Sequence, residues 1–217
     1  MTEDQNIQEI IEKLYQSLIN NKYDGEKRVL YGLAGAPASG KSTLSSRLVQ
    51  YINEKAGKDI ALVVPMDGFH LDNCILDKRG VRAVKGSPQT FDCAGFVSLL
   101  KRLVEDNEDI VYIPTFDRHL DLSRNCASVV TKQHRILIVE GNYLLLNQDP
   151  WTLLKPLFNA TVFLQVEMDE LKKRLIQRWL THGHDQEAAE KRALSNDIPN
   201  AELVLTKSNT SDYLFKN

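Results

Sequence analysis

Hydrophobic positions in this chain form five short runs that alternate with segments of helical periodicity. Three of the runs are continuously apolar, as expected for parallel strands that are buried on both faces. Strands that alternate with helices favour right-handed crossovers and a parallel sheet. The pattern therefore predicts an α/β fold with a parallel core sheet flanked by helices. The expected strands are 29–34, 60–66, 110–113, 136–139 and 161–166, and the expected helices are 42–55, 93–105, 150–158 and 170–181.

A further helical pattern precedes the first strand. Apolar residues recur at spacings of three and four from Ile7 to Ile19, which places them on one helix face. We expect an amphipathic N-terminal helix within residues 1–25 that packs against the body of the protein, although a partner-binding helix would show the same pattern. The sequence has no repeat, low-complexity tract or linker, so we expect one domain over residues 1–217.

The first predicted strand leads into a segment that fills every fixed position of the pattern G-x-x-x-x-G-K-[ST]. Between a strand and a helix, such a loop binds the phosphates of a nucleoside triphosphate, because its backbone N–H groups point inward. Lys41 supplies a charge for the terminal phosphates, and the Ser42 hydroxyl can ligate Mg²⁺. A glycine turn before a surface helix is the alternative. The predicted nucleotide-binding residues are Gly35, Ala36, Pro37, Ala38, Ser39, Gly40, Lys41, Ser42 and Thr43.

Carboxylates follow two further predicted strands. Asp67 comes directly after 60–66 and Glu140 directly after 136–139, so both should lie at the same edge of the sheet as the loop. One carboxylate beside Mg²⁺–ATP can hold the metal ion while the other accepts a proton from an attacking hydroxyl. Gly68 would leave room for an acceptor near the backbone, so we assign Asp67 as the base and Glu140 as the metal-side acid. Either carboxylate on its own could equally be a helix N-cap or an ordinary acidic residue in a loop.

Loops after the predicted strands carry candidates for acceptor binding. An aromatic ring with imidazole and guanidinium groups suits a small polyhydroxylated or acidic compound. Each of these residues fits a solvated loop position equally well. The polar and basic stretch within residues 68–90 fits either a flap over the acceptor or a mobile surface loop. The candidates are His70, Phe116, Arg118, His119 and Arg124.

Arginines follow the last predicted strand. Arg174 and Arg178 are four residues apart and share a helix face, and Arg192 lies further along. An arginine that reaches over the phosphates would stabilise charge on the transferred group. We therefore expect a helical lid at residues 170–196 with Arg178 as its catalytic arginine. A solvated helix face is the alternative, and it is strongest for Arg174.

Composition narrows the class of protein. The net charge is −2, which gives no basic surplus for nucleic acid or an anionic membrane. No apolar run approaches the ~20 residues of a membrane span. The three cysteines are scattered and lack metal-ligand spacing, as expected for reduced thiols. We expect a cytoplasmic protein whose partner is a small-molecule hydroxyl acceptor, without nucleic-acid or membrane partners, and the sequence leaves a homodimer open.

Seven segments form a set that is similar to one family. They are GAPASGKST (35–43), MDGFH (66–70), KGSPQTFD (85–92), PTFDRH (114–119), VEGNYLLL (139–146), RLIQRW (174–179) and NDIPNAELV (196–204). From residue 29 onward the chain resembles the uridine kinase, pantothenate kinase and phosphoribulokinase branch of P-loop kinases. It looks most like small bacterial nucleoside- or fructokinase-like kinases.

The resemblance implies a P-loop kinase fold with a helical lid, and ATP and Mg²⁺ as cofactors. It also implies that Asp67 is the catalytic base and that Arg178 or a neighbour is a lid arginine. Residues 208–212 would border the adenine. Uridine kinases have an acidic residue for the ribose where this chain has Gly86, so the acceptor is not identified. The residues implied to stand near the acceptor are Phe116, Asp117, His119 and Arg124.

Two other functions compete with a kinase. A GTPase-type switch or assembly factor needs D-x-x-G after a strand and [NT]-K-x-D for guanine, but the chain has DGFH at 67–70 and TKSN at 206–209. The side-chain amide of Asn209 would leave one N–H donor of guanine facing another N–H donor, which would cost about 1–3 kcal/mol of binding free energy. A non-catalytic nucleotide-binding module is the other alternative. We predict an ATP-dependent kinase that phosphorylates a hydroxyl of a sugar, nucleoside or pantothenate-like compound.

Overall fold

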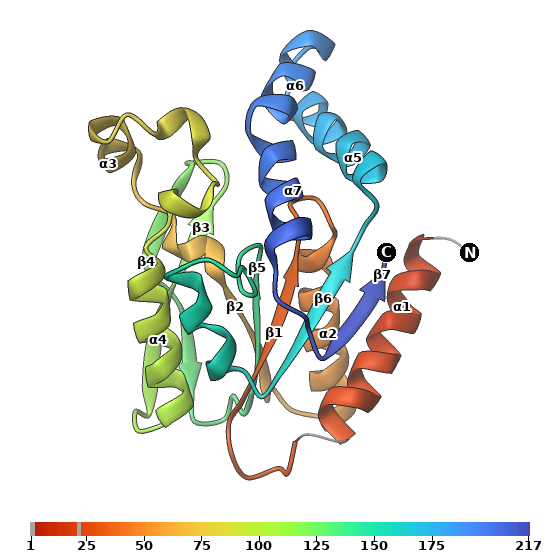
Figure 1. Cartoon of the computed structure of the whole chain (residues 1–217). Coiled ribbons are helices and arrows are strands. Elements are labelled where there is room, and N and C mark those ends of the chain that lie inside the picture. The colour runs from red at the N-terminus through yellow and green to blue at the C-terminus, as the bar shows by residue number, and fades with distance from the viewer. Residues whose placement is uncertain (1–2, 21–22) are drawn as a thin grey trace.

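A five-stranded parallel sheet forms the centre of the molecule, in the order β2-β5-β1-β6-β7 (Figure 1). The computed structural model describes residues 3–20 and 23–217. Four of the five predicted strands lie in this sheet, so the predicted α/β class with a parallel core sheet is confirmed. The strands are β1 (Val29–Gly35), β2 (Ala61–Pro65), β5 (Ile136–Gly141), β6 (Ala160–Gln165) and β7 (Tyr213–Lys216).

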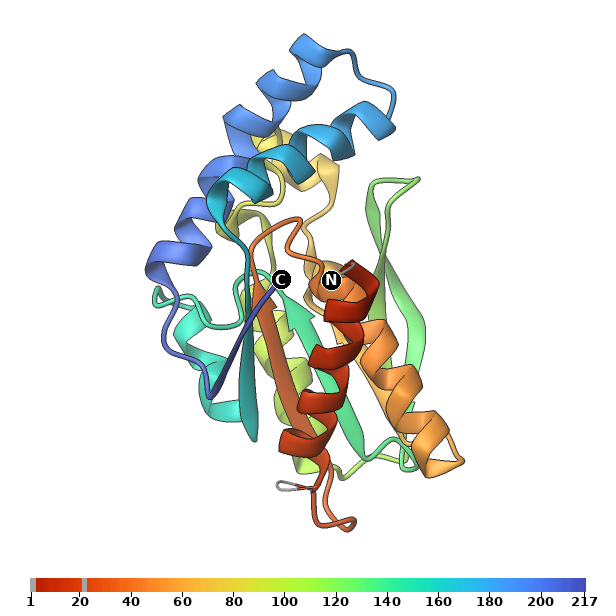
Figure 2. The same ribbon diagram turned by 90° about the vertical axis from the view of Figure 1, so that its right-hand side faces the viewer.

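Both faces of the sheet are buried. Alternate residues of a strand point to opposite faces, so the residues of one strand contribute to two separate clusters. On β1, Val29, Tyr31 and Leu33 belong to one hydrophobic cluster, whereas Leu30 and Ala34 belong to another. The two clusters are covered by different helices (Figure 2). The helices of the first cluster are α1 (Glu3–Leu14) and α2 (Lys41–Ala56), and those of the second include α4 (Cys93–Glu105).

The N-terminal helix packs against the sheet rather than projecting from it. It consists of α1 and a following π-helical turn, η1 (Tyr15–Asn20). The side chain of Ile19 and residues 1–2 and 21–22 of the expected segment lie outside the described residues. The apolar face that the periodicity predicted is buried through Ile7, Ile10, Ile11, Leu14 and Leu18.

The prediction that residues 110–113 form a strand of the central sheet is wrong. They begin β3 (Ile110–Asp117), which pairs antiparallel with the unpredicted β4 (Leu122–Thr131) in a separate two-stranded sheet. Ile110 and Tyr112 are exposed, while Val111 and Ile113 are buried. The apolar run therefore concealed the alternation of a strand with one solvated face.

Residues 150–158 do not form the predicted α-helix. They form two 3₁₀ turns, η5 (Trp151–Leu153) and η6 (Lys155–Leu157). Pro156 lies in the middle of this segment, and a proline cannot donate the backbone hydrogen bond that an α-helix requires there. The predicted helix at 170–181 is present as α5 (Met168–Thr181).

Helical segments stand over the carboxyl-terminal edge of the sheet on two sides (Figure 1). On one side is α3 (Asn73–Lys78), within the expected flap. On the other is a helical layer made by α5, α6 (Gln186–Arg192), η7 (Ala193–Asp197) and α7 (Ile198–Lys207). None of the helices in the described residues is long and apolar enough to cross a membrane. The ends of β1, β2 and β5 thus lie beneath these two groups of helices (Figure 1).

The buried face of α1 yields a stability prediction. Ile11 is 1% exposed, so Ile11→Ala should lower the free energy of unfolding by about 2–5 kcal/mol through lost burial and the cavity that remains. Urea unfolding followed by circular dichroism measures this. The exposed Lys13→Ala in the same helix is the control, with an expected change within about 0.5 kcal/mol. Similar small changes in both variants would mean that α1 is not part of the folding core.

Candidate active site

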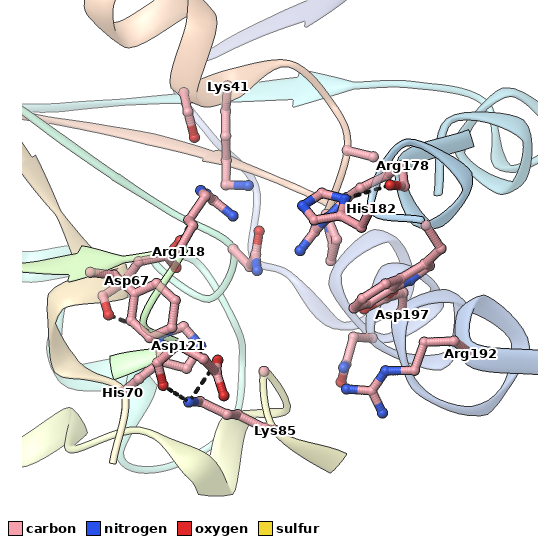
Figure 3. A pocket seen from close by; sticks show the side chains of 18 of the residues that line it. Lys41, Asp67, His70, Lys85, Arg118, Asp121, Arg178, His182, Arg192 and Asp197 are labelled. Atoms are coloured by element: carbon pink, nitrogen blue, oxygen red, sulfur yellow. Dashed lines mark hydrogen bonds and ion pairs between the residues drawn. The ribbon is translucent and has the colours of Figure 1, made fainter. Parts of the chain in front are cut away.

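A pocket of about 510 Å³ lies where β1, β2 and β5 end. Lys41 is at its base, and the two walls carry different sets of side chains (Figure 3). One wall, from the segments after β2 and from the β3–β4 hairpin, holds Asp67, His70, Lys85, Arg118 and Asp121. The opposite wall, from the helical layer, holds Arg178, His182, Arg192 and Asp197.

The glycine-rich loop forms the base of the pocket. Gly40 precedes α2 with φ of 91°, a conformation that side chains rarely adopt, and no described side chain caps this helix. An uncapped helix N-terminus at the base of a pocket suits an anion. Within the loop, Gly35, Ala36 and Ser39 are buried. The lining residues among those predicted for the nucleotide are Pro37, Ala38, Gly40, Lys41, Ser42 and Thr43.

Glu140 sits at the centre of this edge of the sheet. The strand register pairs it with Leu33 of β1 and with Pro65 of β2. It is buried, and the Ser42 hydroxyl donates a hydrogen bond to its Oε2 at 3.1 Å. Burial raises the pKa of Glu140, and the charge of Lys41 opposes this rise. Burial likewise lowers the pKa of Lys41, opposed by Glu140 and Asp67, so each charge stabilises its neighbour.

Asp67 lies in the 3₁₀ turn η2 (Met66–Phe69) that follows β2. Its Oδ2 is 3.4 Å from Nη2 of Arg118 on the hairpin, and both residues line the pocket. The expectation that Gly68 leaves room for an acceptor is wrong. A Cβ at this position would come 2.5 Å from the carbonyl oxygen of Pro114, so β3 already fills that space. The glycine lets the hairpin approach, which brings Arg118 to Asp67.

His70 is held between two aromatic rings. Its ring centroid is 4.0 Å from that of Phe91 and 4.5 Å from that of Phe116. Its Nδ1 is 2.8 Å from the carbonyl oxygen of Asp67, an acceptor, so Nδ1 carries a hydrogen, and in the neutral ring Nε2 is an acceptor. Burial lowers the pKa of His70, although Asp67 acts in the opposite direction. The structure thus brings His70 and Phe116 together in the pocket, as the sequence suggested.

Three other residues implied for the acceptor lie in the hairpin turn or in the strand ends beside it, outside the described pocket lining. Oδ1 of Asp117 accepts hydrogen bonds from the backbone N–H groups of His119 and Leu120, both at 3.1 Å. Nη1 of Arg124 is 3.8 Å from Oδ2 of Asp117. In this arrangement Asp117 shapes the turn, and roles for Asp117, His119 and Arg124 at the acceptor stay predictions.

The three candidate arginines have different surroundings in the helical layer. Arg178 lines the pocket, with its guanidinium 5.5 Å from the ring of Trp179. Arg192 packs over the same ring at 5.2 Å and also lines the pocket. Nε of Arg174 is instead 2.9 Å from Oε1 of Glu170 on the same helix. The geometry therefore favours Arg178 and Arg192 over Arg174 for contact with a bound phosphate.

Sequence reasoning missed several pocket residues. Oδ1 of Asn142 is buried and has no hydrogen-bond partner in the described part of the chain, so a ligand donor could satisfy it. The sequence feature that could have identified Asn142 is its position two residues after Glu140, at a strand end. Trp179 had no assigned role beyond its place in the segment RLIQRW, yet it lines the pocket and its Nε1 donates to Oδ2 of Asp197 at 2.6 Å. The other pocket residues that were missed include Phe91, Asp121, His182 and Asn200.

Comparison with known proteins identifies the family. The model of the "Phosphoribulokinase / Uridine kinase family" matches residues 30–209. A Schizosaccharomyces pombe protein named "Putative uridine kinase C227.14" is 36% identical over 197 residues, which cover 88% of this chain and 84% of that protein. The chain therefore belongs to the phosphoribulokinase/uridine kinase family.

Solved structures agree on the architecture. The crystal structure of a "putative fructose transport system kinase" from Silicibacter sp. TM1040 is similar with a TM-score of 0.87 and 38% identity, over 99% of both chains. YFH7 from Saccharomyces cerevisiae has a TM-score of 0.84 at 20% identity, over 98% of this chain and 99% of its own, and supports the fold alone. The predicted P-loop kinase fold is confirmed, and the protein is a kinase that transfers phosphate from ATP to a small molecule.

The base of the pocket yields a prediction for Lys41. Lys41→Ala should weaken ATP binding or abolish turnover, because the terminal phosphates lose the cation that faces them. Calorimetric titration with Mg²⁺–ATP, together with circular dichroism to show that the variant is folded, measures this. Unchanged affinity together with unchanged turnover in a folded variant would rule out this role.

Proposed function

We propose that the protein transfers the γ-phosphoryl group of Mg²⁺–ATP to a hydroxyl of a small metabolite, such as a sugar, a nucleoside or a pantothenate-like compound. The observation that carries this proposal is the meeting of Lys41, Asp67 and Glu140 at one edge of the sheet beneath two walls of polar side chains. Membership in a kinase family favours this reading over a GTPase-type switch or a non-catalytic module.

Each group has a part that its position supports. The phosphate loop binds the triphosphate, and Lys41 neutralises its terminal oxygens. Asp67 accepts the proton of the attacking hydroxyl, while Arg118 at 3.4 Å holds its carboxylate in place. His70 and Phe116 bind the acceptor, and Nε2 of the neutral imidazole suits a hydroxyl donor. Arg178 stabilises the charge on the transferred group.

The residues present fit a magnesium ion. Hydroxyl and carboxylate oxygens are ligands that Mg²⁺ accepts, and Ser42 and Glu140 bring such oxygens within 3.1 Å of each other. Bound there, Mg²⁺ would supply positive charge against the negative charge of the phosphates. Among the described residues no cluster of three or more His, Cys, Asp or Glu side chains forms a metal site. We therefore assign Ser42 and Glu140 to the metal side, together with the phosphates of ATP.

A second cavity, of about 440 Å³, supports a site for the adenine. Ser208, Asn209, Thr210 and Ser211 line it, together with Val166 and other residues that follow β6. Oγ of Ser208 is buried without a partner in the described chain, so a bound base could satisfy it. These four residues fall in the segment 208–212, which would border the adenine if the family resemblance holds there.

Further features of the proposal concern the whole chain. We propose one kinase domain in which residues 68–90 act as a flap over the acceptor and residues 170–196 act as a lid. The net charge of −2 supports a small-molecule partner rather than nucleic acid or a membrane surface, and the scattered cysteines support a cytoplasmic location. A homodimer stays open.

The acceptor is found by a screen. Purified protein is incubated with Mg²⁺–ATP and a panel of sugars, nucleosides and pantothenate-like compounds, and ADP release is followed with a coupled enzyme assay. Lys41→Ala is the matched control for contaminating kinases. Acceptor-dependent ADP release by the wild type alone supports the proposal. Slow hydrolysis that no compound stimulates, or stronger binding of GTP than of ATP, would contradict it.

The two carboxylates should differ in phenotype. Asp67→Asn should abolish phosphoryl transfer while Mg²⁺–ATP affinity stays near wild type, because the amide cannot accept the proton. Glu140→Gln should instead raise the Mg²⁺ concentration needed for half-maximal activity. Steady-state assays with Mg²⁺ titration and calorimetry measure both. Full activity of Asp67→Asn would contradict its assignment, and exchanged phenotypes would exchange the roles.

Arg178 and Arg174 form a matched pair for the lid. Arg178→Ala should lower kcat on the order of a hundredfold with little change in ATP affinity, because it loses a charge that acts mainly in the transition state. Arg174→Ala should have a smaller effect, since its guanidinium pairs with Glu170. Both are assayed at saturating ATP with the acceptor from the screen. Equal, small effects would transfer the assignment to Arg192.

A further inference from the structure

The two walls of the pocket are tied together through the backbone of residues 83–86. Nη1 of Arg192 in the helical layer donates to the carbonyl oxygen of Ala83 at 3.1 Å. Nδ2 of Asn196 in the same layer donates to the carbonyl oxygen of Lys85 at 2.8 Å. The hydroxyl of Tyr143, after β5, donates to the carbonyl oxygen of Gly86 at 2.6 Å. The flap is thus held by side chains from two other parts of the chain.

The side chain of Lys85 continues this connection to the hairpin. Its Nζ lies 2.8 Å from Oδ1 of Asn73, 2.6 Å from the carbonyl oxygen of Asp121 and 2.9 Å from Oδ1 of Asp121. It also lies 5.2 Å from the centre of the Phe116 ring. An ammonium group has three N–H donors, and three oxygens surround this one. Only 9% of the side chain is exposed, so the charge of Lys85 interacts with oxygens of the protein rather than with a ligand.

The contacts run on from Lys85 to the proposed base. Phe116, beneath the ammonium, stacks on His70, and Nδ1 of His70 contacts the carbonyl oxygen of Asp67. On the other side, Oδ1 of Asn196 accepts from Nδ2 of Asn200, one turn further along, at 3.1 Å.

Asn196 and Asn200 are both buried, and Asn200 lines the pocket. Lys85 is therefore the point at which the flap, the hairpin and the helical layer meet. The segment NDIPNAELV, marked in the sequence, supplies its contact from the layer.

We propose that Lys85 is a positioning residue for the acceptor. Its ammonium holds Phe116 and the hairpin in place, and its carbonyl oxygen holds Asn196. The two walls therefore stay at a fixed distance from each other in the part of the pocket that binds the acceptor. The inference rests on the proposed kinase function. It differs from a charge contact with the substrate, because the ammonium is already enclosed by protein oxygens. It differs from a general contribution to folding, because its effect should fall on the acceptor and not on ATP.

Lys85→Met tests this, since methionine keeps most of the aliphatic stem but lacks the ammonium. We expect the KM for the acceptor to rise about tenfold or more, while the KM for ATP and the Kd for Mg²⁺–ADP stay within about twofold of wild type. Lys78→Met is the control, because Lys78 is an exposed lysine at the end of α3 in the same flap. It should leave both substrates unaffected.

A second variant keeps the test decisive if Lys85→Met does not fold. Asn196→Asp is nearly isosteric but places a carboxylate oxygen where an N–H met the Lys85 carbonyl oxygen, and it should weaken acceptor binding in the same way. In the double variant, the KM for the acceptor should rise by less than the product of the two single fold-changes, because both substitutions break one network. An unchanged acceptor KM in either variant, or equal losses for acceptor and ATP, would overturn the proposal.

Hydrogen exchange separates failure of this inference from failure of the kinase assignment, since it needs no acceptor. In Lys85→Met, amides of residues 82–87 and 193–200 should exchange about tenfold faster than in the wild type or in Lys78→Met. Amides of α2 beneath the phosphate loop should be unchanged. Faster exchange in both segments supports the connection even if no acceptor is found. Exchange unchanged in residues 193–200 would refute it.

Discussion

The parallel register of β5 between β1 and β2 is the constraint on which the site depends. It pairs Glu140 with Leu33 on one side and with Pro65 on the other. The phosphate loop follows β1 and Asp67 follows β2, so the same register brings both to Glu140. Because the strands are parallel, all three carboxyl-terminal ends open toward one edge. A shift of one residue in β5 would turn Glu140 to the other face of the sheet.

The charges at this edge stabilise one another before any ligand binds. Burial raises the pKa of Glu140 and lowers that of Lys41, so each charge would be costly alone. Their attraction and the Ser42 hydrogen bond offset that cost. A cation, an oxygen pair and the start of α2 are therefore fixed where a triphosphate with its metal ion would lie. Such an arrangement needs little reorganisation during the reaction.

Local sequence was sufficient to predict the sheet edge. The loop motif, Asp67 and Glu140 could be placed because each follows an apolar strand, and the strand–helix alternation determines where such ends meet. The opposite walls could not be predicted in this way. Asp121 and Asn200 enter the pocket only through contacts between distant segments, and Trp179 had no assigned role beyond its place in the segment RLIQRW.

Two errors show the physical limits more directly. The run at 110–113 is apolar at every position, so the sequence could not show that Ile110 and Tyr112 face solvent. Gly68 indicated that space was needed beside Asp67, but not that the Pro114 backbone would occupy it. A glycine reports that a side chain does not fit, whereas the tertiary fold decides what comes close.

The central claim is that this edge of the sheet transfers a phosphoryl group to an acceptor instead of to water. A single-turnover reaction with excess enzyme and ATP labelled with ³²P at the γ-position tests it most directly, with the acceptor present or omitted. The account predicts that the label appears in an organic phosphate ester only when the acceptor is present. Label that appears solely as inorganic phosphate, at a rate that the acceptor does not change, would contradict it.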